Sequence, residues 1–70
     1  MENETKYTCC WSVNSGSTYS EFYGNNYRKM ARDARKIVKG NTLPGNSGGF
    51  DIFRDEDPEE SVVVWNYSRK

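Results

Sequence analysis

Apolar and polar residues alternate along the first part of the chain, from Lys6 to Val13. One set of alternating positions holds Tyr7, Cys9, Trp11 and Val13, and the other holds Thr8, Cys10 and Ser12. Successive side chains of a strand point to opposite faces, so this period of two predicts a half-buried strand over residues 6–13.

Between Tyr27 and Lys39 the period becomes that of a helix. At 100° per residue, the apolar side chains fall within an arc of about 120°, and they are Tyr27, Met30, Ala31, Ala34, Ile37 and Val38. Asn25 or Asn26 is suited to cap the start, and Gly40 is suited to end the helix. We therefore predict one amphipathic helix, whose two alanines allow close packing on a sheet.

Two further strands are predicted in the last third of the chain, over residues 50–54 and 61–67. The acidic segment "DEDPEE" separates them, and a polar loop of this length is typical of an antiparallel hairpin. In the last strand, either Val62 and Val64 or Val63, Trp65 and Tyr67 must face away from the helix. The sequence does not decide between these two faces, and the uncovered one is a candidate contact or dimer surface.

Residues 14–26, "NSGSTYSEFYGNN", are polar and rich in turn-forming residues, which predicts a long loop with a short helical turn. Its aromatic residues are Tyr19, Phe22 and Tyr23. They either form a recognition surface, in which serine, glycine and asparagine supply adaptable hydrogen bonds, or fold back over the edge of the core.

The predicted fold is a small single α+β domain over residues 1–70, with residues 1–5 as a flexible N-terminus. Its elements follow in the order β-α-β-β, and the one helix packs on a three-stranded antiparallel sheet. A chain of this length has a thin core.

The net charge is zero, but the ten basic and ten acidic side chains are segregated along the chain. The basic group lies on the predicted helix and comprises Arg28, Lys29, Arg32, Arg35, Lys36 and Lys39. The acidic group follows the third predicted strand and comprises Asp55, Glu56, Asp57, Glu59 and Glu60. The basic group is a candidate phosphate-binding stripe and the acidic group a candidate contact for a basic groove. Each is alternatively a solvated surface.

The segment "GNSGG" around Ser47 is similar to the nucleophile loop of trypsin-like proteases. A serine nucleophile needs a base to accept its proton, and the chain contains no histidine. We therefore interpret the segment as a glycine-rich turn. Cys9 and Cys10 are adjacent, so we expect reduced thiols, with Cys9 buried and Cys10 more accessible. No catalytic residue, metal site or cofactor is predicted, and we expect a protein that is not an enzyme.

In size, charge segregation and predicted element order, the chain resembles the small inhibitor proteins that phages and mobile elements encode against host defence systems, anti-CRISPR proteins among them. This resemblance implies a cytoplasmic protein-binding module with no membrane association. Two alternatives remain, namely a nucleic-acid-binding accessory protein that uses the basic helix, and a dimeric structural protein. No residue motif accompanies the resemblance, so it assigns no site.

Overall fold

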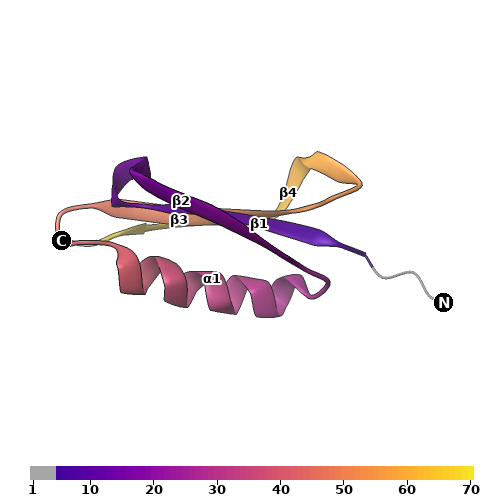
Figure 1. Ribbon diagram of the computed structural model, residues 1–70, viewed down its shortest axis with the longest axis horizontal. Coiled ribbons are helices and arrows are strands. Elements are labelled where there is room, and N and C mark those ends of the chain that lie inside the picture. The colour runs from indigo at the N-terminus through magenta and orange to yellow at the C-terminus, as the bar shows by residue number, and fades with distance from the viewer. Residues whose placement is uncertain (1–4) are drawn as a thin grey trace.

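The computed structural model describes residues 5–70, and residues 1–4 of the predicted flexible N-terminus lie outside the described residues. One helix lies beneath an antiparallel sheet (Figure 1). Its elements are β1 (Tyr7–Val13), the short 3₁₀ turn η1 (Asn14–Gly16), β2 (Thr18–Gly24), α1 (Tyr27–Asn41), β3 (Ser47–Arg54) and β4 (Asp57–Ser68). The four strands lie in the order β2-β1-β3-β4, so β1 and β3 are central and β2 and β4 are the edges.

The α+β class, the single helix and the antiparallel sheet are confirmed, but the predicted three strands and β-α-β-β order are wrong. The order is β-β-α-β-β, because Thr18–Gly24 forms a strand where a loop was predicted. η1 turns the chain back so that β2 pairs with β1, from Val13 opposite Thr18 to Tyr7 opposite Gly24. Asn14 and Ser15 adopt positive φ values of 54° and 58° in this turn, a conformation that asparagine tolerates well.

The helix forms where its period predicts, with Asn26 as the N-cap. The Asn26 side chain accepts a hydrogen bond from the Lys29 backbone N–H at 3.3 Å. The predicted end at Gly40 is wrong by one residue, since α1 continues to Asn41. Thr42 then closes the last turn, because its hydroxyl donates to the Val38 carbonyl at 2.6 Å and its side chain is buried.

The core lies between α1 and the two central strands. Met30, Ala31, Ala34 and Val38 are the buried residues of the helix, as its apolar arc predicts. They pack with the buried residues of the sheet, which are Cys9, Val13, Phe50 and Ile52. Ala34, Cys9, Val38 and Ile52 are each 0% exposed. The small alanine side chains allow the helix to lie close to the sheet.

The register of the last strand settles which of its faces points toward the helix. Val63 lies opposite Ile52 and Trp65 opposite Phe50, both of which belong to the core. Trp65 also contacts the rings of Phe50 and Tyr67, with centroids 5.6 Å and 5.7 Å apart. Val62 and Val64 are therefore the residues turned away from the core, and they are 36% and 63% exposed.

The β3–β4 hairpin is confirmed, but the predicted six-residue acidic loop is not. Only Asp55 and Glu56 form the turn, and Asp57 already belongs to β4. The pairing between the two strands shifts on either side of Phe53, so Pro58, Glu59 and Glu60 have no direct partners in β3. Extra residues in one strand bend it, and this end of the hairpin rises away from the helix (Figure 1).

The glycines of the "GNSGG" segment allow close contact between backbones. A Cβ atom on Gly48 would lie 2.7 Å from the Ser12 carbonyl oxygen, and one on Gly49 would lie 2.5 Å from that of Trp65. Gly45 has φ +87° in the turn before β3, a conformation that favours glycine. The interpretation of the whole segment as a turn is therefore wrong, because Ser47, Gly48 and Gly49 already belong to β3.

We expect Gly49→Ala to destabilise the protein by about 1–3 kcal/mol, because the strands must separate to admit the methyl group. Gly40→Ala is the matched control. It lies in the helix with no atom within 4 Å of the added Cβ, so it should stabilise the protein by about 0.5–1 kcal/mol. Urea unfolding of both variants gives the two free energies, and equal stabilities would contradict the close packing.

Candidate interaction surfaces

One face of the sheet is left uncovered by α1, and we call it the open face. From the registers, it carries the side chains of Thr8, Cys10, Ser12, Tyr19, Glu21, Tyr23, Ser47, Asp51, Phe53, Ser61, Val64, Asn66 and Ser68. Tyr19 is 74% exposed, Tyr23 67% and Val64 63%. Exposed large side chains on both outer strands of one face are typical of a contact surface.

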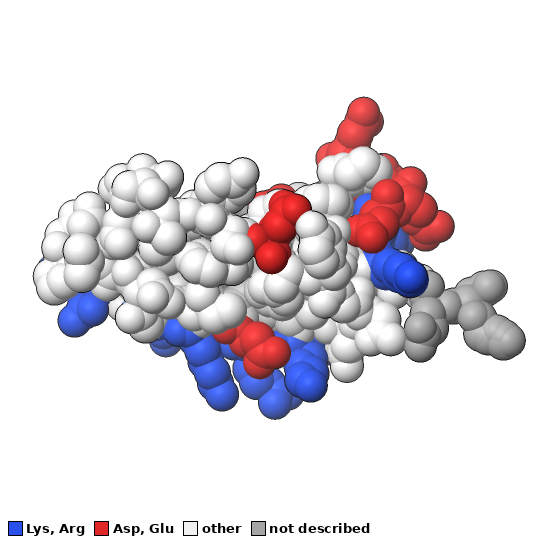
Figure 2. Space-filling view, viewed as in Figure 1, with Lys and Arg blue, Asp and Glu red and all other residues white. Residues whose placement is uncertain are grey.

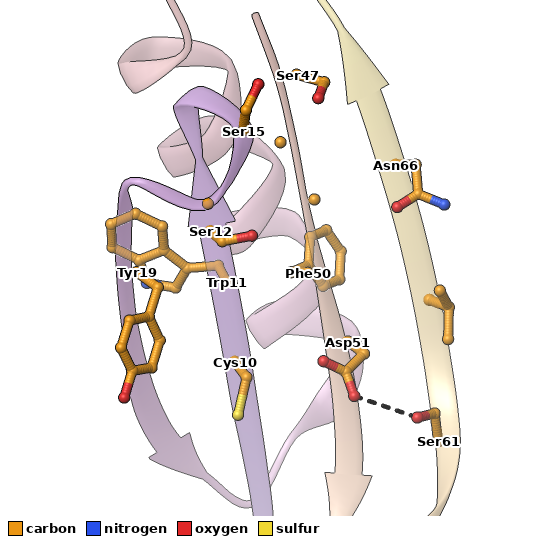
Figure 3. A pocket seen from close by; sticks show the side chains of 14 residues that line it. Cys10, Trp11, Ser12, Ser15, Tyr19, Ser47, Phe50, Asp51, Ser61 and Asn66 are labelled. Carbon is orange, nitrogen blue, oxygen red and sulfur yellow. Dashed lines mark hydrogen bonds between the residues drawn. The ribbon is translucent and has the colours of Figure 1, made fainter.

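A shallow hollow of about 970 Å³ lies on the open face, near the end where η1 meets β3. Tyr19 stands on one side of it and Asn66 on the other, with Ser12 between them (Figure 3). Its floor is low because Ser12, Ser47 and Gly49 have small side chains or none. The hollow offers hydroxyl and amide groups together with the exposed ring of Tyr19, a combination suited to the side chains of a protein partner.

The open face is acidic. Glu21 accepts hydrogen bonds from the Tyr23 hydroxyl at 2.6 Å and from the Cys10 thiol at 3.5 Å. The hydrogen bond to Glu21 raises the pKa of Tyr23 above its ordinary value. Asp51 accepts a hydrogen bond from Ser61 at 3.2 Å (Figure 3). β1, β2 and residues 62–68 contain no lysine or arginine. The one cation of β3, Arg54, lies on the opposite face of the sheet.

The basic helix residues all lie on the exposed side of α1, opposite the open face (Figure 2). They are Arg28, Lys29, Arg32, Arg35, Lys36 and Lys39. No acidic side chain within residues 5–70 forms an ion pair with any of them. Arg28 lies over the ring of its neighbour Tyr27, 5.9 Å from the centroid. The structure therefore places the predicted basic residues together on the exposed side of one helix, which also carries the exposed Asp33.

The five predicted acidic residues cluster at the β3–β4 hairpin end of the molecule (Figure 2). They do not all have the same surroundings. Asp55 accepts a hydrogen bond from the buried Thr8 hydroxyl at 2.6 Å, and its backbone N–H donates to the Lys6 carbonyl. Glu60 lies 3.8 Å from Arg54, although all five acidic residues are exposed. The free acidic groups are therefore fewer than the sequence indicates.

The three aromatic residues predicted to act together are separated by the strand that contains them. Phe22 lies opposite Cys9 and packs partly buried against the core, while Tyr19 and Tyr23 point to the open face. Phe22 therefore covers the core, whereas Tyr19 and Tyr23 form part of the exposed surface. The uncovered sheet face is a candidate contact surface in the sequence analysis, but the residues that β2 adds to it were missed because β2 was predicted as a loop.

Cys9 and Cys10 lie on opposite faces of β1 as predicted, Cys9 buried in the core and Cys10 half-buried on the open face. Both are free thiols. Burial raises the pKa of Cys9 to about 12, with further contributions from Cys10 and Asp51. Burial and the hydrogen bond to Glu21 raise the pKa of Cys10 as well. Neither thiol therefore has the lowered pKa of an activated nucleophile.

Comparison with protein-family models, with curated proteins and with solved structures finds no match for the chain. No helix within residues 5–70 is long and apolar enough to cross a membrane.

We expect iodoacetamide to modify Cys10 before Cys9 in the folded protein, because Cys9 is inaccessible and its thiolate is disfavoured. The rate at Cys10 should rise with pH as the thiolate forms. Mass spectrometry of digested samples measures both rates, and the Cys10→Ser variant should retain a single slow thiol. Faster modification of Cys9 would show that the faces of β1 are reversed.

Proposed function

We propose that the protein is a small non-enzymatic protein-binding module whose open face engages a basic surface on a partner. The observation that carries this proposal is the combination of exposed tyrosines with Glu21 and Asp51 on a face where these strands place no cation. Tyrosine supplies large contact area at low entropic cost, and complementary charge favours encounter with a basic partner.

The proposed module would act as the inhibitors of phages and mobile elements do, a resemblance that rests on size and on charge segregation. Such an inhibitor would cover a basic groove of a host defence complex, including a groove that otherwise holds nucleic acid. The acidic hairpin end extends the acidic character of the open face toward one end of the sheet (Figure 2). Inhibition by occupancy requires surface complementarity and no catalytic group, which suits a chain without histidine.

The test compares two variants with the same number of substitutions on opposite faces. Tyr19→Ala with Glu21→Lys alters the open face, and Arg32→Glu with Arg35→Glu alters the helix. All four positions are exposed, so both variants should fold, which circular dichroism verifies. We expect a protein partner captured from host lysate to bind the helix variant normally and the open-face variant at least about tenfold more weakly.

Purified partner then allows the two substitutions to be separated by surface plasmon resonance. Tyr19→Ala should mainly speed dissociation, and Glu21→Lys should mainly slow association, because anchoring rings and surface charges act on different steps. Capture that requires the helix cations and tolerates the open-face changes would exclude the open face as the working surface.

Nucleic-acid binding through α1 is the second candidate, favoured by one specific observation. The six helix cations have no acidic partner within residues 5–70, and the acidic hairpin end lies away from their exposed side (Figure 2). Repulsion by the acidic group is therefore weaker than the sequence indicates. Lysine and arginine side chains along such a surface would displace counterions from a phosphate backbone.

Binding of a short DNA duplex, measured by fluorescence anisotropy over a salt series, tests this candidate. If α1 binds phosphates, log K should fall linearly with log salt, with a slope of about 0.9 per phosphate contacted. Reversing Arg28, Arg32 and Arg35 to glutamate should abolish binding, and Glu56→Gln with Asp57→Asn should strengthen it slightly. Weak binding at physiological salt, unchanged by these substitutions, would exclude the nucleic-acid function.

A further inference from the structure

The edge strand β4 contains the most apolar run of the chain, Val62 to Trp65, yet none of its twelve residues is buried. Val63, Trp65 and Tyr67 are only half-buried beside the core, and Val64 is 63% exposed. Within residues 5–70 no strand pairs with the outer edge of β4. A long apolar edge of this kind is a template for another strand.

The order of the charges along β4 and the residues after it favours pairing with an antiparallel copy of the same strand. Asp57, Glu59 and Glu60 precede the apolar run, and Arg69 and Lys70 follow it. An antiparallel copy of the same strand would place its basic end beside the acidic end of the first, at both ends of the pair. The two apolar runs would then meet in the middle.

We propose that two copies of this chain pair through antiparallel β4 strands about a two-fold axis near Trp65. The stretch Val63–Ser68 pairs with β3 without irregularity, so its other edge is free to accept a partner strand in regular register. In this register Trp65 lies opposite the second copy's Trp65, and Val63 lies opposite its Tyr67. Pairs of aromatic and β-branched residues are among the favourable cross-strand contacts.

The same register places Val64 opposite the second copy's Asn66. It also brings the acidic end of each β4, which bends at the irregular pairing around Phe53, toward the second copy's Lys70. The contact is isologous, as a two-fold interface requires, and it covers the outer edge of the apolar run of β4. The outcome is one eight-stranded sheet with both helices on one side and both open faces on the other. Small domains with thin cores commonly gain stability from such a second subunit.

The other edge strand, β2, does not have these properties. Its only charged residue, Glu21, lies in the middle of the strand. A pair of β2 strands centred there would set two carboxylates against each other, and any other centre would bring no opposite charges together. Like charges directly opposite are unfavourable in a sheet. Charge order thus favours β4 as the paired edge.

Sedimentation equilibrium of the full chain, from micromolar to submillimolar concentration, measures the dimer. We expect a reversible dimer, weakened about tenfold or more by Val64→Lys, since lysine on an edge strand opposes pairing. Tyr19→Lys is the matched control, because Tyr19 is comparably exposed on the same face but lies on β2. It should leave the dimer unchanged.

Circular dichroism verifies that both variants fold. A wild-type chain that remains monomeric throughout this range would overturn the proposal. So would a Tyr19→Lys variant that dissociates as readily as Val64→Lys, since that result would assign the interface to the open face or to β2.

A charge exchange tests the antiparallel arrangement. Glu60→Lys and Lys70→Glu should each weaken the homodimer by about threefold, because each sets like charges opposite one another at both ends. An equimolar mixture of the two variants, one labelled with ¹⁵N, should form heterodimers preferentially in native mass spectrometry, because opposite charges are restored. A statistical mixture of homodimers and heterodimers would overturn the proposed antiparallel register.

Discussion

The structure depends on one packing contact, that of the small face of α1 against β1 and β3. Ala31 and Ala34 allow the helix to approach Cys9 and Ile52, and these residues are almost completely shielded from water. A single helix about 10 Å wide covers roughly two strands spaced about 4.8 Å apart. The two edge strands and the whole second face of the sheet are consequently left outside the core, and the candidate protein-binding face and the candidate dimer edge both lie there.

The charge distribution follows from the same arrangement. Because α1 buries its apolar side, its six cations share the outer side with a single acidic residue, Asp33, and no acidic residue of the described chain forms an ion pair with them. The open face carries Glu21 and Asp51, and the hairpin end adds further carboxylates. A net charge of zero thus conceals a molecule with a basic helix side and an acidic sheet side, and each side suits a different kind of partner.

The sequence predicts the parts of the fold in which periodicity and burial agree. The helix and the β1 faces follow directly from the spacing of apolar residues, including the contrast between Cys9 and Cys10. β2 was missed because its alternating residues include only one core residue, Phe22, and because Tyr19, Glu21 and Tyr23 point to solvent. Its neighbouring serine, glycine and asparagine residues are typical of loops. Tyr19 and Tyr23, which lie four residues apart on one face of β2, were the one available indication of a strand.

The extent of β4 could not be predicted for a different physical reason. Acidic residues and Pro58 disfavour a strand in general, but an edge strand tolerates both where no partner requires the proline N–H. The irregular pairing around Phe53 allows Pro58, Glu59 and Glu60 to lie outside the regular ladder. Local propensity alone therefore describes this segment as a loop, and only the pairing of the whole hairpin identifies it as strand.

The acidic residues differ in whether they support the fold or are available to a partner. Asp55 anchors the hairpin turn to β1 through Thr8, so its carboxylate contributes to the position of the turn. Asp51 is likewise tied to Ser61 across the β3–β4 pair. Glu56 and Asp57 have exposed carboxylates, and neither forms an ion pair within residues 5–70. Substitution of these exposed residues therefore alters surface charge with little change in stability, whereas substitution of Asp55 changes both.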